Sequence, residues 1–155
     1  MRRTVFLLTI FLFFLSSCKV YQDDRLARAP LTQQEKTFIA NFENDVVHHR
    51  RHKLLKYLLP EYKQEQLDGN YNGKIHLFWN QFFCGKQVKT HTFICLRLSQ
   101  VKKINLVKVE KGDDSSQKVL FFEVQSKDHK IIQALILKIL RRNGKTVLGL
   151  IGPYG

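Results

Sequence analysis

The sequence predicts an α+β domain in which N-terminal helices pack on an antiparallel sheet. Apolar residues recur every three or four positions between residues 32 and 83, which is the period of an amphipathic helix. From residue 92 onwards they alternate with other residues, as in a strand with one buried face. Near the C-terminus, Asn143-Gly144 is a strong signal for a tight hairpin turn. We therefore expect helices first and a meandering sheet after them.

The first predicted helix begins at Thr32. Thr32-Gln33-Gln34-Glu35 fits a capping box, in which the threonine hydroxyl accepts a backbone N–H and the glutamate reaches back to the cap. Phe38, Phe42 and Val46 then follow at intervals of four and mark one buried face. A further apolar set predicts a second helix, which Pro60 ends or breaks. This set consists of Leu54, Leu55, Leu58 and Leu59.

The most aromatic stretch of the chain follows a polar segment. Residues 61–74 are polar and contain the turn signals Gly69-Asn70 and Asn72-Gly73. The next apolar residues share one helical face, and they are Ile75, Phe78, Trp79, Phe82 and Phe83. We expect a short amphipathic helix that Gly85 closes. Its aromatic face either fills a core or forms the wall of an apolar pocket.

Strands are predicted in the second half of the chain. Residues 93–98 alternate, and residues 103–110 are rich in Val, Ile and Leu. Alternation slips at Leu106-Val107, which indicates a β-bulge. Residues 112–116 read as a turn, and residues 118–125 as the next strand. The residues expected on one face of that strand are Leu120, Phe122 and Val124, with Val119 and Phe121 on the other.

Residues 130–142 fit two structures. Their aliphatic residues form a helical stripe, made of Ile131, Ile132, Leu135, Ile136, Ile139 and Leu140. Against a helix, the run lacks acidic residues and leads into the Asn143-Gly144 turn signal, with an apolar stretch at residues 146–151 beyond it. We expect a strand, and the alternative is an α+β fold in which residues 130–142 are helical.

Residues for catalysis or metal binding are not assembled in the sequence. His48 and His52 have ligand spacing, but the intervening Arg50-Arg51 would repel a cation, so a solvated or hinge face is the better interpretation. His76 and Glu123 are candidate acid–base groups, and the orientation of each depends on one step of its helix or strand. We predict no catalytic residue, no metal and no cofactor.

The first eighteen residues combine a basic start, a short apolar run and small residues before a cysteine. Arg2-Arg3 precedes an apolar run over residues 5–15, which falls short of the roughly 20 residues that a membrane-spanning helix needs. The run ends in Leu15-Ser16-Ser17-Cys18. This pattern resembles the lipobox signal peptide of bacterial lipoproteins, and it implies that residues 1–17 are cleaved and that Cys18 carries the lipid. A permanent anchor helix and ordinary secretion are the alternatives.

The lipoprotein resemblance divides the rest of the chain. Residues 18–31 are polar and become a lipidated tether, and residues 32–155 become a single α+β domain. Lys19 and the following Gln22-Asp23-Asp24 loosely resemble lipoprotein sorting sequences and favour the outer membrane over the inner one. The domain is then expected in the periplasm or at the cell surface.

Export also affects how the other cysteines and the charge are interpreted. Only Cys84 and Cys95 remain after Cys18, and an exported compartment favours a disulfide between them over two free thiols. Loss of Arg2 and Arg3 with the signal lowers the net charge from +13 to +11. This charge suits the membrane and an anionic envelope component or envelope protein, although it can also serve only solubility. Export removes the basis for a nucleic-acid partner.

The order of the predicted elements resembles the NTF2-like α+β cone of small NTF2-like lipoproteins. Residues 137–152, with Arg-Arg-Asn-Gly-Lys at their centre, are similar to the final hairpin of that family, although Thr146 stands where many relatives have Trp. Phe82-Phe83-Cys84-Gly85 lies where the family has a third helix before the sheet. The resemblance implies a curved sheet around a cavity. The residues expected to line it are His76, Trp79, Phe82, Phe83 and Phe121.

The sequence therefore favours a non-catalytic, lipid-anchored accessory protein of the cell envelope. It would present a basic surface or an apolar pocket to another envelope component. The alternative is an NTF2-like protein that binds a small molecule, or an enzyme of isomerase or hydrolase type, with the aromatic pocket as its site. A closed core filled by Trp79, Phe82 and Phe122 favours the first function. An open cavity holding a buried acid or His76 favours the second.

Overall fold

The computed structural model describes residues 29–113, 116–128, 132–140 and 150–151. Helices precede strands, so the predicted α+β class is confirmed. The helices are α2 (Gln33–Val47), α3 (Arg51–Leu54), α4 (Pro60–Lys63) and α5 (Ile75–Phe82), with 3₁₀ turns at Leu55–Tyr57 and Leu98–Gln100 and a π-helix at Gln64–Asn70. The strands are β1 (Cys84–Lys86), β2 (Phe93–Cys95), β3 (Val101–Lys111), β4 (Gln117–Ser126), β5 (Ile132–Leu140) and β6 (Leu150–Ile151). Within these ranges, we find no helix with the length and apolar character that a bilayer crossing requires.

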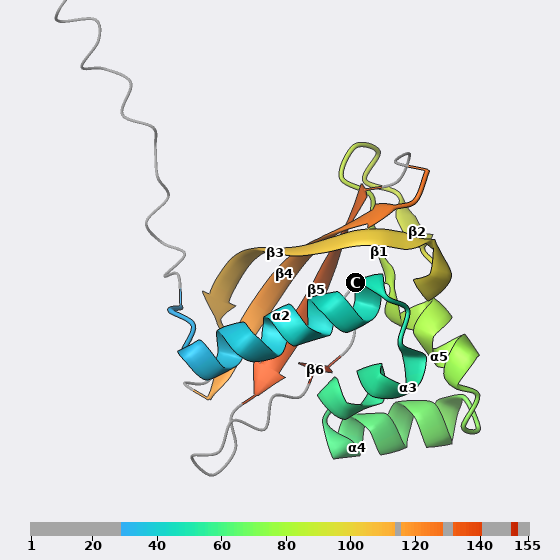
Figure 1. The fold of residues 1–155 in the computed structure, drawn as a ribbon, viewed down its shortest axis with the longest axis horizontal. Coiled ribbons are helices and arrows are strands. Elements are labelled where there is room, and N and C mark those ends of the chain that lie inside the picture. Colours follow the sequence, from blue (N-terminus) through green and yellow to red (C-terminus); the bar gives the residue numbers. More distant parts are fainter. Residues whose placement is uncertain (1–28, 114–115, 129–131, 141–149, 152–155) are drawn as a thin grey trace, which may run out of the picture.

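The strands form two antiparallel sheets. Strands β3, β4, β5 and β6 are neighbours in that order, and β1 and β2 pair separately. Helix α2 runs across one face of the larger sheet, and α3, α4 and α5 lie near the C-terminal end of α2 (Figure 1). The core therefore lies between α2 and the sheet and continues into the helical end.

The inner face of the larger sheet follows from strict alternation along its strands. On β4, Leu120, Phe122 and Val124 are buried as predicted, and the Phe122 ring meets the Phe42 ring of α2 edge-on at 5.9 Å. Strand β5 adds a matching row, which consists of Leu135, Leu137 and Ile139. Each such side chain contributes about 1.5–3 kcal/mol on full burial, so this face is a substantial source of stability.

Helix α2 begins and ends through specific hydrogen bonds. The capping box is confirmed: Thr32 Oγ1 accepts from the Glu35 backbone N–H at 3.2 Å, and Glu35 Oε2 accepts from the Thr32 N–H at 2.7 Å. The helix stops at Val47, and His49 takes a left-handed backbone (φ 54°). Residues 48–50 therefore form the hinge between α2 and α3, and His52 lies on α3.

The polar segment after Pro60 differs from its prediction. The preceding 3₁₀ turn ends at Tyr57, before Pro60 is reached, and Pro60 occupies the first turn of α4. The π-helix continues to Asn70, and turns remain only at residues 71–73. The apolar Tyr62 and Leu67 lie five positions apart and both pack on the core. A π-helical turn brings that spacing to one face, whereas an α-helical pattern does not.

Gly85 does not close α5, which ends at Phe82. Gly85 lies in β1 opposite Ile94, because the pairing of β1 with β2 and the disulfide between Cys84 and Cys95 hold this segment extended. The predicted cysteine pairing is thus confirmed. Closing a loop of this length contributes roughly 3 kcal/mol in the chain-entropy model. Cys18 lies outside the described residues.

The remaining strand predictions are mostly confirmed. Only Phe93–Cys95 of the first alternating stretch pairs as a strand, because Leu98 already belongs to a 3₁₀ turn. The register of β3 shifts between Leu106 and Lys108, which is the expected bulge, and it also shifts between Val101 and Lys103. Residues 132–140 form a strand rather than a helix. The Asn143-Gly144 turn and most of the stretch at 146–151 lie outside the described residues.

The structure does not confirm the NTF2-like cone, since the described sheets are not curled. Two features oppose such a curl. Strands β1 and β2 form their own sheet instead of extending the larger one. Side chains from α2 and the inner face of the sheet also pack directly on each other, as Phe42 does on Phe122.

Candidate functional site

Three of the five aromatic-pocket candidates lie together in the core. Trp79, Phe82 and Phe83 are each at most 2% exposed. The Trp79 and Phe82 ring centroids are 5.0 Å apart, and those of Phe82 and Phe83 are 5.3 Å apart, within the range of favourable edge-to-face contacts. Trp79 Nε1 donates to the Arg51 carbonyl oxygen at 3.2 Å. These side chains fill space with one another.

The other two candidates lie elsewhere. His76 is exposed on α5, one position away from the inward stripe. Phe121 is on the outer face of β4, because it alternates with the buried Leu120 and Phe122. Lys108 Nζ lies 5.5 Å from the centroid of the Phe121 ring, a favourable cation–π distance. The structure therefore does not bring the five residues together.

The candidate acid–base and metal groups are also dispersed. Glu123 is exposed on the outer face of the sheet, His48 is exposed at the end of α2, and His52 is exposed on α3. Among the described residues, no group of three or more His, Cys, Asp or Glu side chains could hold a metal ion. The buried carboxylate of Asp45 is occupied by contacts with Arg50 and Tyr57.

Asp45 holds the corner between α2 and α3. Its carboxylate accepts from Tyr57 Oη at 2.8 Å and from Arg50 Nη1 at 2.9 Å, and Lys56 Nζ lies 3.5 Å away. Burial alone would raise the pKa of Asp45, but the hydrogen bonds from Tyr57 and Arg50 and the charge of Lys56 hold it below its usual value. A carboxylate that is ionised and fully paired in this way stabilises the corner.

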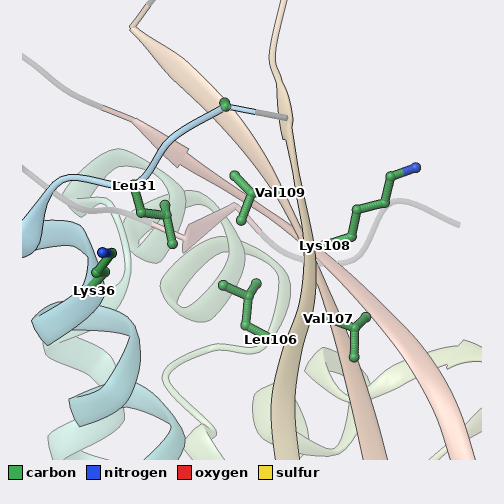
Figure 2. Close-up of a pocket in the computed structure, with 7 residues that line it drawn as sticks. Leu31, Lys36, Leu106, Val107, Lys108 and Val109 are labelled. Carbon is green, nitrogen blue, oxygen red and sulfur yellow. The ribbon is translucent and has the colours of Figure 1, made fainter. Parts of the chain in front are cut away.

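An open groove lies between the start of α2 and the edge strand β3. We call it the α2–β3 groove; its volume is about 540 Å³, and the residues that line it are Ala29, Leu31, Lys36, Leu106, Val107, Lys108 and Val109. Leu31, Leu106 and Val109 point towards one another, whereas Lys108 points away (Figure 2). A second hollow of about 320 Å³ shares Leu31, Lys36 and Leu106 and extends along α2 to Glu43. Together the α2–β3 groove and this second hollow form one apolar depression, with the cationic Lys36 side chain beside it.

The bulge of β3 shapes one wall of this groove. Where the register slips, the Leu106 backbone N–H turns to α2 and donates to Glu43 Oε1 at 2.7 Å. Val107 is the extra residue of the bulge and is 63% exposed. Burial raises the pKa of Glu43, and the hydrogen bond from Leu106 opposes that rise. The Glu43 carboxylate thus accepts a hydrogen bond from one backbone N–H on the outer edge of β3, that of Leu106.

A buried ion pair holds the other wall. Lys118 Nζ of β4 donates to Glu35 Oε2 at 2.6 Å and to the Pro30 carbonyl oxygen at 2.7 Å. Burial alone would raise the pKa of Glu35, but the bonds from Lys118 and Thr32 hold it below its usual value. This contact fixes the segment that carries Leu31 against the sheet. The groove therefore has two walls held by polar contacts.

Sequence reasoning did not find the α2–β3 groove. Its one local signal was the slip of alternation at Leu106-Val107, which marks the wall formed by β3. The partners that complete it are distant in sequence: 63 residues separate Glu43 from Leu106, and 83 separate Glu35 from Lys118. Pairing over such distances leaves no periodic pattern.

No known protein family matches the sequence, and a search of curated proteins finds no match either.

Proposed function

We propose that this protein is a non-catalytic binding protein of the cell envelope, anchored through lipid on Cys18. We further propose that it binds an extended segment of another envelope protein in the α2–β3 groove. The observation that carries the binding role is this open apolar groove beside an edge strand. Of the residues expected to line a catalytic pocket, Trp79, Phe82 and Phe83 instead lie in the core.

An extended segment is the occupant that suits the groove best. Strand β3 stands at the end of the strand order, so one of its edges has no strand partner in the described part of the chain. Edge strands recruit extended peptides through main-chain hydrogen bonds, and neighbouring pockets take alternate side chains. Leu31 and Val109 provide such an apolar pocket.

Charge favours a partner segment with acidic residues. Lys36 lies on α2 at the groove, whereas Lys108 points away from it and is paired with Glu110. The one carboxylate of the adjoining hollow, Glu43, already accepts the Leu106 N–H. Electrostatic attraction of this kind increases the association rate and helps to select the partner.

A photo-crosslinking experiment tests the groove in living cells. A photoreactive amino acid at position 107 is expected to form one crosslinked product of defined mass with an envelope protein. Lys36→Glu should abolish the product, because it reverses the charge at the groove. Lys53→Glu is the matched control, since Lys53 is exposed on α3, away from the groove residues. The same product with Lys36→Glu, or no product at position 107, would contradict the proposed site.

A further inference from the structure

The hairpin of β1 and β2 has a surface that neither the core nor the groove explains. Phe93 is 59% exposed and Val88 is 50% exposed. Among the described residues, the large hydrophobic side chains with such exposure are Val47, Leu77, Val88, Phe93 and Val107. Phe93 is the one aromatic residue in that set. Since Phe93 and Val88 both belong to this hairpin, its exposed apolar surface is a candidate interaction surface.

The hairpin is held rigidly in place. The disulfide between Cys84 and Cys95 closes its base. In its loop, the Gln87 N–H donates to the Thr92 carbonyl at 2.8 Å, and the Thr90 hydroxyl donates to Gln87 Oε1 at 2.7 Å. The Val88 N–H donates to the Ile132 carbonyl at 2.8 Å and so ties the loop to β5. The exposed side chains are therefore presented on a preorganised frame.

The stretch of sequence that contains the hairpin carries charge of one sign. No Asp or Glu occurs between Asp68 and Glu110, a stretch that contains the whole hairpin. The Lys and Arg residues of this stretch are Lys74, Lys86, Lys89, Arg97, Lys102, Lys103 and Lys108. Lys86 and Lys89 are exposed on the hairpin itself, and Lys86 is the direct cross-strand partner of Phe93. An exposed phenylalanine thus has a lysine on the same face of the hairpin.

We infer that the β1–β2 hairpin docks on an anionic lipid surface, with Phe93 and Val88 entering the headgroup region and Lys86 and Lys89 contacting the phosphates. Phenylalanine is among the apolar residues that interfacial segments bury at the boundary between headgroups and acyl chains, and lysines beside it are attracted to anionic lipids. The inference rests on the proposed envelope location, which places such a surface within reach. The hairpin would give the lipid-anchored domain a second membrane contact and a defined orientation.

The test places a fluorescent reporter on the hairpin. Full-length protein purified in detergent is reconstituted with vesicles whose phosphatidylcholine carries brominated acyl chains, either alone or mixed equally with phosphatidylglycerol. In the F93W variant, bromine should quench the introduced tryptophan in the anionic vesicles. The native Trp79 is fully buried and contributes the same background to every variant. V107W is the matched control, because Val107 is as exposed as Phe93 and lies on β3 instead of the hairpin.

Charge dependence separates docking from mere proximity to the membrane. Quenching of F93W should decrease strongly at about 1 M salt, where the Debye length falls to about 3 Å. The added changes K86E and K89E should decrease it as well, by roughly tenfold in the docking equilibrium or more. The inference would be overturned if F93W and V107W are quenched equally or if F93W is not quenched. It would also be overturned if the quenching of F93W does not change with salt or with the charge reversals.

The same samples distinguish this inference from the proposed function. Flotation of wild-type protein with pure phosphatidylcholine vesicles reports the lipid anchor, because those vesicles carry no net charge. If the protein fails to float with them, the anchor proposal is wrong. Quenching of F93W in the anionic vesicles would still report docking of the hairpin.

Discussion

Replacing Lys118 with methionine should destabilise the domain by about 3 kcal/mol. Lys118 Nζ lies 2.6 Å from Glu35 Oε2, and the two side chains are 17% and 4% exposed. Removing one partner of a buried ion pair costs about 3–5 kcal/mol, because the remaining charge has lost its compensation. Glu35 keeps its hydrogen bond from the Thr32 N–H at 2.7 Å, so we expect the lower end of that range. Methionine retains most of the apolar stem of lysine.

Urea unfolding with the disulfide intact measures this loss, and a thermal scan should show a fall of roughly 10 °C for a domain of this size. The matched control is E35Q/K118M. The added Glu35→Gln change removes the uncompensated charge and keeps the cap, since glutamine can also complete a capping box. We therefore expect the double variant to recover about half of the loss. The double-mutant cycle then isolates the coupling between the two charges.

The pH dependence of the stability difference between K118M and the wild type can refute the buried ion pair. In the wild type, the pKa of Glu35 is lowered in the folded state, so its contribution is present above the unfolded pKa of about 4.3 and is lost as the pH falls through the folded pKa. In K118M, burial is no longer opposed by lysine, and protonation of Glu35 should relieve the defect. The gap between K118M and wild type should therefore narrow towards low pH. A gap below about 1 kcal/mol at pH 7, or one that does not change with pH, would refute the buried pair.

Two further predictions test the inner face of the sheet and the groove wall. Phe122→Ala should cost about 3–5 kcal/mol in urea unfolding, whereas Phe121→Ala, on the outer face, should cost much less; equal losses would contradict the assigned alternation. Glu43→Gln should keep the bond from the Leu106 N–H and raise stability at pH 7, because the raised pKa of Glu43 makes its ionised form unfavourable above the unfolded pKa. That advantage should disappear as the pH falls below the unfolded pKa, and a Glu43→Gln variant less stable than wild type at pH 7 would show that the charge is needed.

Local patterns predicted the elements of this fold well. The capping box at Thr32 and Glu35 involves residues three apart, so both partners are visible in one turn of sequence. The bulge at Leu106-Val107 interrupts an alternation that a single strand displays. For residues 132–140, the turn signal that follows in sequence favoured a strand over the helical stripe, and the structure agrees.

What the sequence could not provide was the way in which the elements meet. The stripe of Phe78, Trp79 and Phe82 predicted an inward face, but its period is the same for a filled core and for a cavity wall. The π-helix around Leu67 has no α-helical spacing to detect. The α2–β3 groove depends on Glu43 and Lys118, whose partners are more than sixty residues away. Such contacts follow from tertiary packing, which one sequence does not encode as a repeat.

The intact mass of the protein purified from cell membranes tests the central claim, that lipid on Cys18 anchors this domain in the envelope. We expect a chain that begins at Cys18, lacks residues 1–17 and carries the added mass of a diacylglyceryl group and an amide-linked acyl chain. A chain that retains residues 1–17, or one that begins near residue 18 without lipid, would contradict it.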